Sequence, residues 1–163
     1  MDMVITGKVL VYDDNIDTDI ICPGRFLELN ESKDIANVAM SGIDSNFPEK
    51  AKTHSIIIAG KNFGCGSSRD HAVRALKYSG LKAVIAQSFG RIFYRNALNL
   101  GLLVIISKDA RNIFNDGESG KIDLTKGKIT NMDKIITVDS DVISEEEFKV
   151  YEQGGMIQIY KQN

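Results

Sequence analysis

The segment from Gly60 to His71, Gly-Lys-Asn-Phe-Gly-Cys-Gly-Ser-Ser-Arg-Asp-His, gathers reactive side chains between glycines. A serine hydroxyl becomes a base or nucleophile when nearby groups stabilise its anion, and a guanidinium binds a carboxylate through paired hydrogen bonds. Glycines adopt backbone angles that other residues resist, and they let a ligand approach the main chain. We therefore expect Arg69, together with the free amides at the start of the helix that follows, to form a binding place for an anion, of which a carboxylate is the simplest.

The flanking sequence predicts that this segment joins a strand to a helix. Residues 55–59, Ser-Ile-Ile-Ile-Ala, have the continuous apolar character of a buried strand, and apolar residues recur at helical spacing from Ala72 onward. Open α/β sheets bind ligands at the carboxyl ends of their strands, where the free amides of a following helix also attract anions. A simpler interpretation is that Ser67 or Ser68 only caps this helix.

Strand and helix patterns alternate through the middle of the chain. Residues 83–86 and 102–106 are short apolar runs that predict buried strands, and a helical pattern over residues 89–99 separates them. Gly80 and Gly101 stand where glycine commonly ends a helix. Strands and helices that alternate at this spacing predict a parallel sheet with right-handed crossovers.

The two ends of the chain predict additional elements. These are strands over residues 4–12 and 156–160, a long functional loop over residues 16–27, helices over residues 33–40 (capped by Ser32) and 144–153, and antiparallel strands within residues 121–138. We therefore expect an α/β fold with a parallel βαβαβ centre and additional antiparallel strands, forming one compact domain over residues 1–163.

Composition and charge exclude several classes of function. A formal net charge of -2 and a pI near 5.7, with basic residues scattered along the chain, give no footprint for nucleic acid. No stretch approaches the roughly 18 to 20 apolar residues of a membrane helix, and the start of the chain lacks a signal-peptide pattern. We expect a cytoplasmic protein whose partner is a small molecule or another protein.

The two cysteines limit the metal chemistry of this chain. Cys22 and Cys65 are expected to remain free thiols in a reducing cytosol. An iron-sulfur cluster takes three or four thiolates, and the chain has no Cys-x-x-Cys pair. We expect no metal site within this chain.

The segment around Ser67 resembles the Asn-Phe-Gly-Cys-Gly-Ser-Ser-Arg signature of the aconitase superfamily's small, swivelling domain. The similarity is greatest to the separate small subunits of 3-isopropylmalate dehydratase and homoaconitase. It extends over nearly the whole chain in three blocks, the other two being Asp17 to Leu27 and Ser88 to Ala97. The resemblance implies the β/β/α arrangement of the swivelling domain.

The resemblance also implies roles for individual residues. Ser67 matches the catalytic serine that takes the substrate proton, and Ser68 and Arg69 match carboxylate-binding positions. Substrate choice is assigned to the loop that here reads Phe26, Leu27, Glu28 and Leu29, and Arg25 just before it is expected to bind substrate as well. Homoaconitase-like members carry an arginine at the third position of the loop Phe26 to Leu29, so the glutamate here favours an alkyl-substituted malate over a tricarboxylate.

The expected activity is that of a hydro-lyase subunit which isomerises 2-isopropylmalate and 3-isopropylmalate in leucine biosynthesis. The resemblance implies that a separate large subunit holds a 4Fe-4S cluster, that no cofactor binds this chain, and that the two subunits form a heterodimer or heterotetramer. Small subunits of homoaconitase or 2,3-dimethylmalate dehydratase are alternatives. Two other classes are a stand-alone regulatory or RNA-binding domain, which the lack of a basic stripe disfavours, and a Gly-x-Ser-x-Gly hydrolase, whose second glycine is absent after Ser67.

Overall fold

A seven-stranded sheet organises the fold in the computed structural model, which describes residues 3–162. Its order is β4-β3-β2-β1-β5-β6-β7. The first four strands are parallel: β1 (Val4–Val11), β2 (Ile56–Ile58), β3 (Ala83–Ala86) and β4 (Val104–Ile106). Helices α4 (His71–Tyr78) and α5 (Arg91–Leu100) connect them as crossovers. The predicted parallel centre is confirmed.

Strand β1 joins this parallel part to an antiparallel part. Residues 9–11 of β1 pair with β2, whereas residues 4–8 pair with β5 (Ser119–Asp123). Strands β6 (Lys128–Asn131) and β7 (Ile136–Asp139) then continue in antiparallel fashion. The antiparallel strands predicted from residues 121–138 are confirmed.

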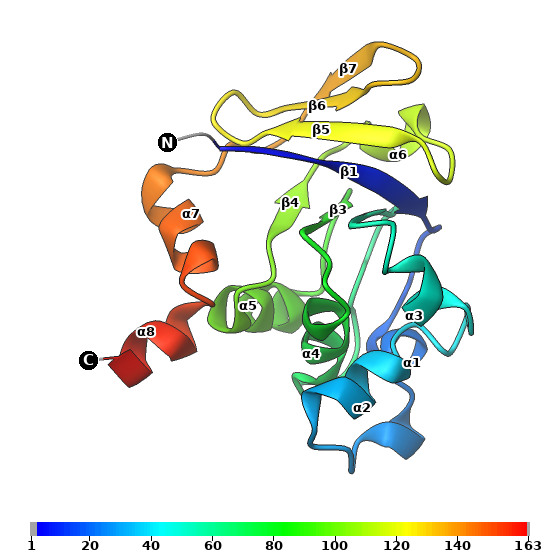
Figure 1. Ribbon diagram of the computed structural model, residues 1–163, viewed down its shortest axis with the longest axis vertical. Coiled ribbons are helices and arrows are strands. Elements are labelled where there is room, and N and C mark those ends of the chain that lie inside the picture. The colour runs from blue at the N-terminus through cyan, green and yellow to red at the C-terminus, as the bar shows by residue number, and fades with distance from the viewer. Residues whose placement is uncertain (1–2, 163) are drawn as a thin grey trace.

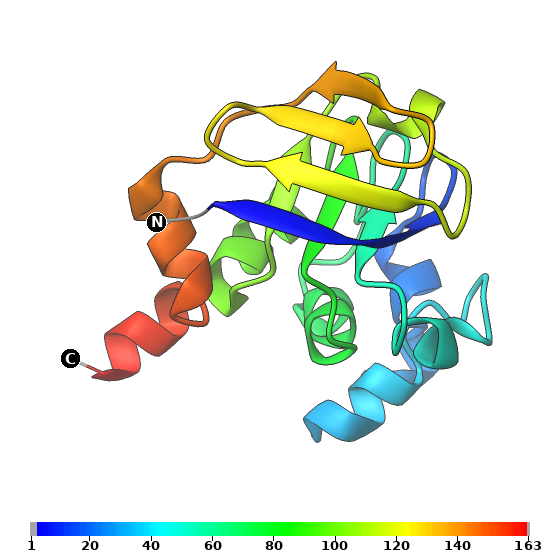
Figure 2. The same cartoon turned by 45° about the horizontal axis from the view of Figure 1, so that its top comes forward.

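The sheet curls so that its antiparallel part covers one face of its parallel part. Because side chains alternate along a strand, Ile85 packs on that face with Ile122 and Ile129, whereas Val84 packs on the other face with Val73 and Leu76 of α4. Figures 1 and 2 show the resulting layers, with β5 to β7 on one side of the parallel strands and α4 and α5 on the other. The implied β/β/α arrangement is confirmed.

The remaining helices are short and lie around this framework (Figure 1). They are α1 (Thr18–Ile21), the 3-10 turn Gly24–Phe26, α2 (Ser32–Asn37), α3 (Phe47–Lys50), α6 (Ala110–Ile113), α7 (Glu145–Glu152) and α8 (Met156–Gln162). Within residues 3–162, no helix combines the length and the apolar character needed to cross a membrane. The prediction of one domain over residues 1–163 includes Met1, Asp2 and Asn163, which lie outside the described residues.

Two predicted elements, the loop over residues 16–27 and the helix over residues 33–40, differ in the structure because local hydrogen bonds and backbone angles set where their helices begin and end. The long loop over residues 16–27 contains α1, whose start is capped when the Asp17 carboxylate accepts a hydrogen bond of 2.8 Å from the Ile20 amide. The helix expected over residues 33–40 is shorter, and Ser32 is its first residue rather than its cap. Met40 has a left-handed φ of 60°, which no helix continues through.

The strand predicted over residues 156–160 is wrong, because this segment forms α8. Gly154 and Gly155 have φ values of 88° and 94°, and they turn the chain against the end of α5. A Cβ on Gly155 would lie 2.4 Å from the Asn99 carbonyl oxygen, so the contact is main chain against main chain. The segment leaves this turn beside α5 rather than beside a sheet edge, so it has no strand to pair with and forms a helix.

Candidate active site

The turn after β2 has a shape that only glycine permits at two positions. Gly64 and Gly66 have φ values of 78° and 123°. A Cβ on Gly64 would lie 2.3 Å from the ring of Phe93, a buried residue of α5. The close approach of the turn to α5 brings the following residues, Cys65 to Arg69, into a fixed position at the carboxyl edge of the parallel strands.

The segment after β3 supports this turn from the side. Phe63 forms a β-bridge with Phe89, and its carbonyl accepts a hydrogen bond of 2.9 Å from the Gly90 amide. The rings of Phe63, Phe89 and Phe93 pack together with centroids 5.6 to 6.2 Å apart. The segment that begins near Ser88 therefore packs directly against the turn that carries Ser67.

The segment after β1 holds the other side of the turn. A series of hydrogen bonds of 2.7 to 2.9 Å joins the two segments: Asn15 N to Lys61 O, Gly64 N to Ile16 O, Thr18 N to Cys65 O, and Ser67 N to Thr18 Oγ1. The residues that follow β1 and those that follow β2 therefore form one rigid unit.

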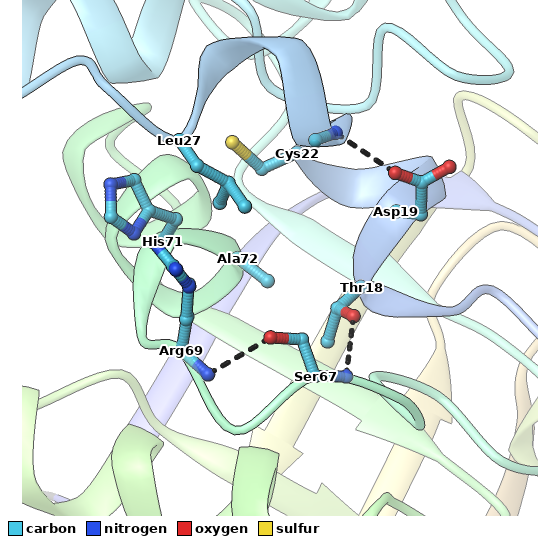
Figure 3. A pocket seen from close by; sticks show the side chains of 9 residues that line it. Thr18, Asp19, Cys22, Leu27, Ser67, Arg69, His71 and Ala72 are labelled. Atoms are coloured by element: carbon cyan, nitrogen blue, oxygen red, sulfur yellow. Dashed lines mark hydrogen bonds between the residues drawn. The ribbon is translucent and has the colours of Figure 1, made fainter.

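A small cavity of about 70 Å³ opens between α1, the turn and the start of α4 (Figure 3). It is lined by Thr18, Asp19, Cys22, Gly24, Leu27, Ser67, Arg69, His71 and Ala72. The Ser67 hydroxyl accepts a hydrogen bond of 3.1 Å from the Arg69 amide. A donor fixed on this oxygen favours its anionic form, which is what a serine base requires.

The structure brings three of the predicted site residues together, namely Ser67, Arg69 and Leu27. The other five, Ser68, Arg25, Phe26, Glu28 and Leu29, lie outside the lining of this cavity. The guanidinium of Arg25 lies over the Phe26 ring at 4.5 Å, Leu29 packs against the core, and Glu28 is exposed. Assignment of these residues to substrate binding stays a prediction.

The helix-capping interpretation of the two serines is wrong. Helix α4 begins at His71, with Asp70 as its N-cap residue, and no side chain caps this start within the described residues. Ser67 instead bonds the amide two residues ahead of it. His71 ties α4 to the loop before α2, because its Nε2 lies 3.2 Å from the Leu29 carbonyl oxygen, a structural contact.

Sequence reasoning missed Thr18, Asp19 and Cys22 as lining residues. The Asp19 carboxylate accepts a hydrogen bond of 2.9 Å from the Gly24 amide and so shapes the turn that carries Leu27. Burial raises the pKa of the Cys22 thiol and Asp19 adds to the effect, while Arg74 opposes it. The acidic, hydroxyl-containing start of α1 was a capping signal that could have revealed this helix.

Neither cysteine of the chain forms a disulfide. In the described part of the chain, no group of three or more histidine, cysteine or acidic side chains is placed to hold a metal ion. The side chains present therefore do not fit a 4Fe-4S cluster.

Comparison with known proteins supports this fold. The aconitase C-terminal domain family matches residues 16–110, which include the turn, α1 and the segment after β3. A crystal structure of 3-isopropylmalate dehydratase from Methanocaldococcus jannaschii has a TM-score of 0.89 and 44% sequence identity, covering 98% of this chain and 95% of that chain. The fold and the serine-arginine turn thus define an α/β domain of the aconitase swivelling type.

Two further relatives narrow the assignment to a group within this family. The 3-isopropylmalate dehydratase small subunit of Halothermothrix orenii is 43% identical over 98% of this chain and 96% of its own length. The methanogen homoaconitase small subunit of Methanocaldococcus jannaschii is 44% identical over 98% and 92%. The chain belongs to the aconitase C-terminal domain family, in its group of dehydratase small subunits.

Proposed function

We propose that this chain is the small subunit of a 3-isopropylmalate dehydratase and that it supplies the base and part of the substrate site. The observation that carries the proposal concerns the Ser67 hydroxyl. It faces a cavity beside Arg69 and accepts a hydrogen bond of 3.1 Å from the Arg69 amide. Sequence identities of 41% and 43% over nearly the whole chain to two small subunits that carry this name support it.

The proposed reaction removes water from two adjacent carbons of a substituted malate and then adds it back with the hydroxyl on the other carbon. Ser67, as its alkoxide, takes the proton from the carbon next to a carboxylate, and hydroxide leaves the neighbouring carbon. Arg69 binds that carboxylate and stabilises the charge that develops on it. Rehydration with the positions of hydrogen and hydroxyl exchanged gives the isomer.

The side chains around the cavity support a substrate with an alkyl group. Leu27 and Ala72 are among the residues that line the cavity, and they offer an apolar surface for a branched alkyl chain. The part of the Leu27 loop that lines the cavity consists of Gly24 and Leu27, and Arg25 of the same loop lies outside the lining. A third carboxylate would therefore meet no cation from this loop inside the cavity, whereas Arg69 is assigned to the carboxylate beside the reacting carbon. Relatives carry the names of more than one substrate, so we infer isopropylmalate from this apolar surface.

The size of the cavity supports completion of the site by a larger partner subunit. Ligand pockets for small molecules have volumes of about 300 Å³ or more. The cavity that contains both Ser67 and Arg69 has only about 70 Å³, and a second hollow of about 430 Å³ that Ser67 also lines does not include Arg69. A malate held by both residues would therefore also need walls from elsewhere. The group that withdraws the hydroxyl, expected to be a 4Fe-4S cluster, would belong to that partner. The cytoplasmic location and the heterodimeric or heterotetrameric assembly stay predictions.

Reconstitution tests the proposal. The chain is purified alone and together with the large dehydratase subunit of the same organism, under anaerobic conditions, and interconversion of 2-isopropylmalate and 3-isopropylmalate is measured. We expect activity only in the mixture, with a higher kcat/KM for isopropylmalate than for homoaconitate or 2,3-dimethylmalate. Turnover by the chain alone, or a preference for homoaconitate in the mixture, would contradict the proposal.

A further inference from the structure

Thr18 lies where α1 contacts the main chain of Ser67 (Figure 3). Its Oγ1 accepts a hydrogen bond of 2.9 Å from the Ser67 amide, and its own amide donates 2.9 Å to the Cys65 carbonyl oxygen. We propose that Thr18 is a positioning residue, which fixes the peptide of Ser67 so that the serine hydroxyl faces the substrate. In its kinetic consequences this inference rests on the proposed function.

The two contacts act together as a clamp on the residues that flank Gly66. Thr18 is only 8% exposed, so its side of the hydrogen bond is shielded from competing water, whereas Ser67 itself is exposed. A Cβ on Gly66 would lie 2.8 Å from Thr18 Oγ1, so the glycine is what allows the two segments to approach this closely. Gly66 also has many accessible backbone states, and the clamp selects one of them.

The clamp is itself anchored in α1. Thr18 is the first residue of α1, and its carbonyl accepts a hydrogen bond of 2.8 Å from the Cys22 amide, while Asp17 caps the helix. Three separate groups of Thr18, namely the hydroxyl, the amide and the carbonyl, are therefore engaged. The main chain of α1 fixes the backbone of Thr18, so its hydroxyl can reach the Ser67 amide from one defined position.

The clamp has a consequence for the chemistry of Ser67. Because the Ser67 amide is bonded to Thr18, it is not available to the serine hydroxyl or to a ligand, and the Arg69 amide is the donor that reaches Oγ. Loss of the clamp would leave the Ser67 side chain present but incorrectly aimed. Such a misplacement lowers kcat far more than it weakens substrate binding.

Two substitutions separate the hydroxyl from the shape of the residue. Thr18→Val keeps the size and branching but removes the acceptor, whereas Thr18→Ser keeps the acceptor and removes the methyl group. Thr130→Val is a matched control, because it removes a threonine hydroxyl that is bonded at 2.8 Å to Thr137 on the β6 and β7 strands. Thermal unfolding of each variant reports any general loss of stability.

Solvent exchange of the Ser67 amide, measured by NMR on the chain alone, tests the clamp without any activity. We expect Thr18→Val to speed this exchange at least about tenfold, while Thr18→Ser and Thr130→Val stay within about threefold of the parent. Equal exchange rates in the parent and Thr18→Val would overturn the proposal. This measurement stands even if the reconstituted complex has no dehydratase activity, an outcome that would refute the proposed function alone.

Kinetics of the reconstituted complex test the consequence. We expect Thr18→Val to lower kcat at least about tenfold with KM within about threefold, and Thr18→Ser to restore most of the loss. If Thr18→Ser is as impaired as Thr18→Val, the methyl packing matters and the hydroxyl does not. That result, or a kcat for Thr18→Val equal to that of the parent, would overturn the positioning role.

Discussion

Arg69 has two separable tasks in the proposed site. Its amide donates to Ser67 Oγ at 3.1 Å, and its side chain lines the cavity where a substrate carboxylate would bind. The first task belongs to the main chain and survives most substitutions. The second depends on the planar guanidinium, which grips a carboxylate with two parallel hydrogen bonds.

Replacing Arg69 with lysine should therefore weaken substrate binding while the main-chain donor persists. Lysine keeps the charge but loses the paired contact, so we expect kcat/KM for isopropylmalate to fall about 10- to 100-fold in the reconstituted complex. Arg111→Lys is the control, because Arg111 contacts Tyr12 and Asp13 away from the cavity, and it should stay within about threefold. Equal losses of kcat/KM in the two variants would show that the Arg69 side chain does not bind the substrate.

The sequence predicted the core of the candidate site but not its surroundings. Ser67 and Arg69 were found because hydroxyl, guanidinium and glycine lie within one short segment. Thr18 was missed because its contact with Ser67 reaches the turn across a gap of more than forty positions in the sequence. Such pairing depends on which strands become neighbours, and local patterns do not carry that information.

The turn between β2 and α4 depends on close packing against α5. Gly64 illustrates this, because it combines a φ of 78° with a position where a Cβ would lie 2.3 Å from the Phe93 ring. A side chain here meets two penalties, the left-handed backbone and the overlap with a buried ring.

Gly64→Ala should lower the free energy of unfolding by about 3 kcal/mol or more, since a left-handed alanine costs about 1 to 2 kcal/mol and overpacking adds about 1 to 3 kcal/mol. Gly80→Ala is the matched control, because Gly80 has a φ of 89° but no atom within 4 Å of an added Cβ. Urea unfolding of both variants measures the difference. If they lose the same stability, the ring contact contributes nothing and only the backbone angle matters.

Asp44 links β1 to the segment around α3 and makes part of the stability depend on pH. Burial opposes ionisation of this carboxyl, but hydrogen bonds from Lys50 at 2.9 Å, Tyr12 at 3.0 Å and the Asn46 amide at 3.1 Å outweigh it and lower the pKa of Asp44. The folded protein then binds this proton less readily than the unfolded chain. The stabilisation is present above the ordinary aspartate pKa near 4 and is lost as the pH falls through the lowered value.

Asp44→Asn should reduce the free energy of unfolding at pH 7 by about 2 kcal/mol, the typical contribution of hydrogen bonds to a charged group. The difference between parent and variant should shrink as the pH is lowered below about 4. Urea unfolding across this range measures it, with Glu152→Gln on the exposed end of α7 as a control. A difference that stays constant with pH would show that the ionised carboxylate is not the stabilising form.

Elements with strong local signals were predicted well, and elements fixed by docking were not. Strands β2, β3 and β4 are continuous apolar runs, and Gly101 ends α5 as expected. The segment Met156 to Tyr160 has β-branched residues and was assigned to a strand, yet it forms α8. Its conformation follows from where Gly154 and Gly155 dock on α5, which propensity alone does not reveal.

The whole molecule is a scaffold that presents one edge of a parallel sheet. Both faces of the parallel strands are covered, one by β5 to β7 and the other by α4 and α5, so the carboxyl edge is where side chains can meet a ligand. The cavity that contains both Ser67 and Arg69 at that edge has about 70 Å³ and is too small for a malate by itself. The chain therefore carries part of a substrate site, which a larger subunit is proposed to complete.

The most direct test of this account is proton removal by Ser67 in the reconstituted complex. The parent and Ser67→Ala are compared for kcat and for the incorporation of solvent deuterium into isopropylmalate, and Ser79→Ala at the far end of α4 is the control. We expect Ser67→Ala to lower both rates about 100- to 10,000-fold while substrate still binds, because a general base contributes about that factor. Near-parental turnover and deuterium incorporation in Ser67→Ala would contradict the account, because the base would then belong to the partner subunit.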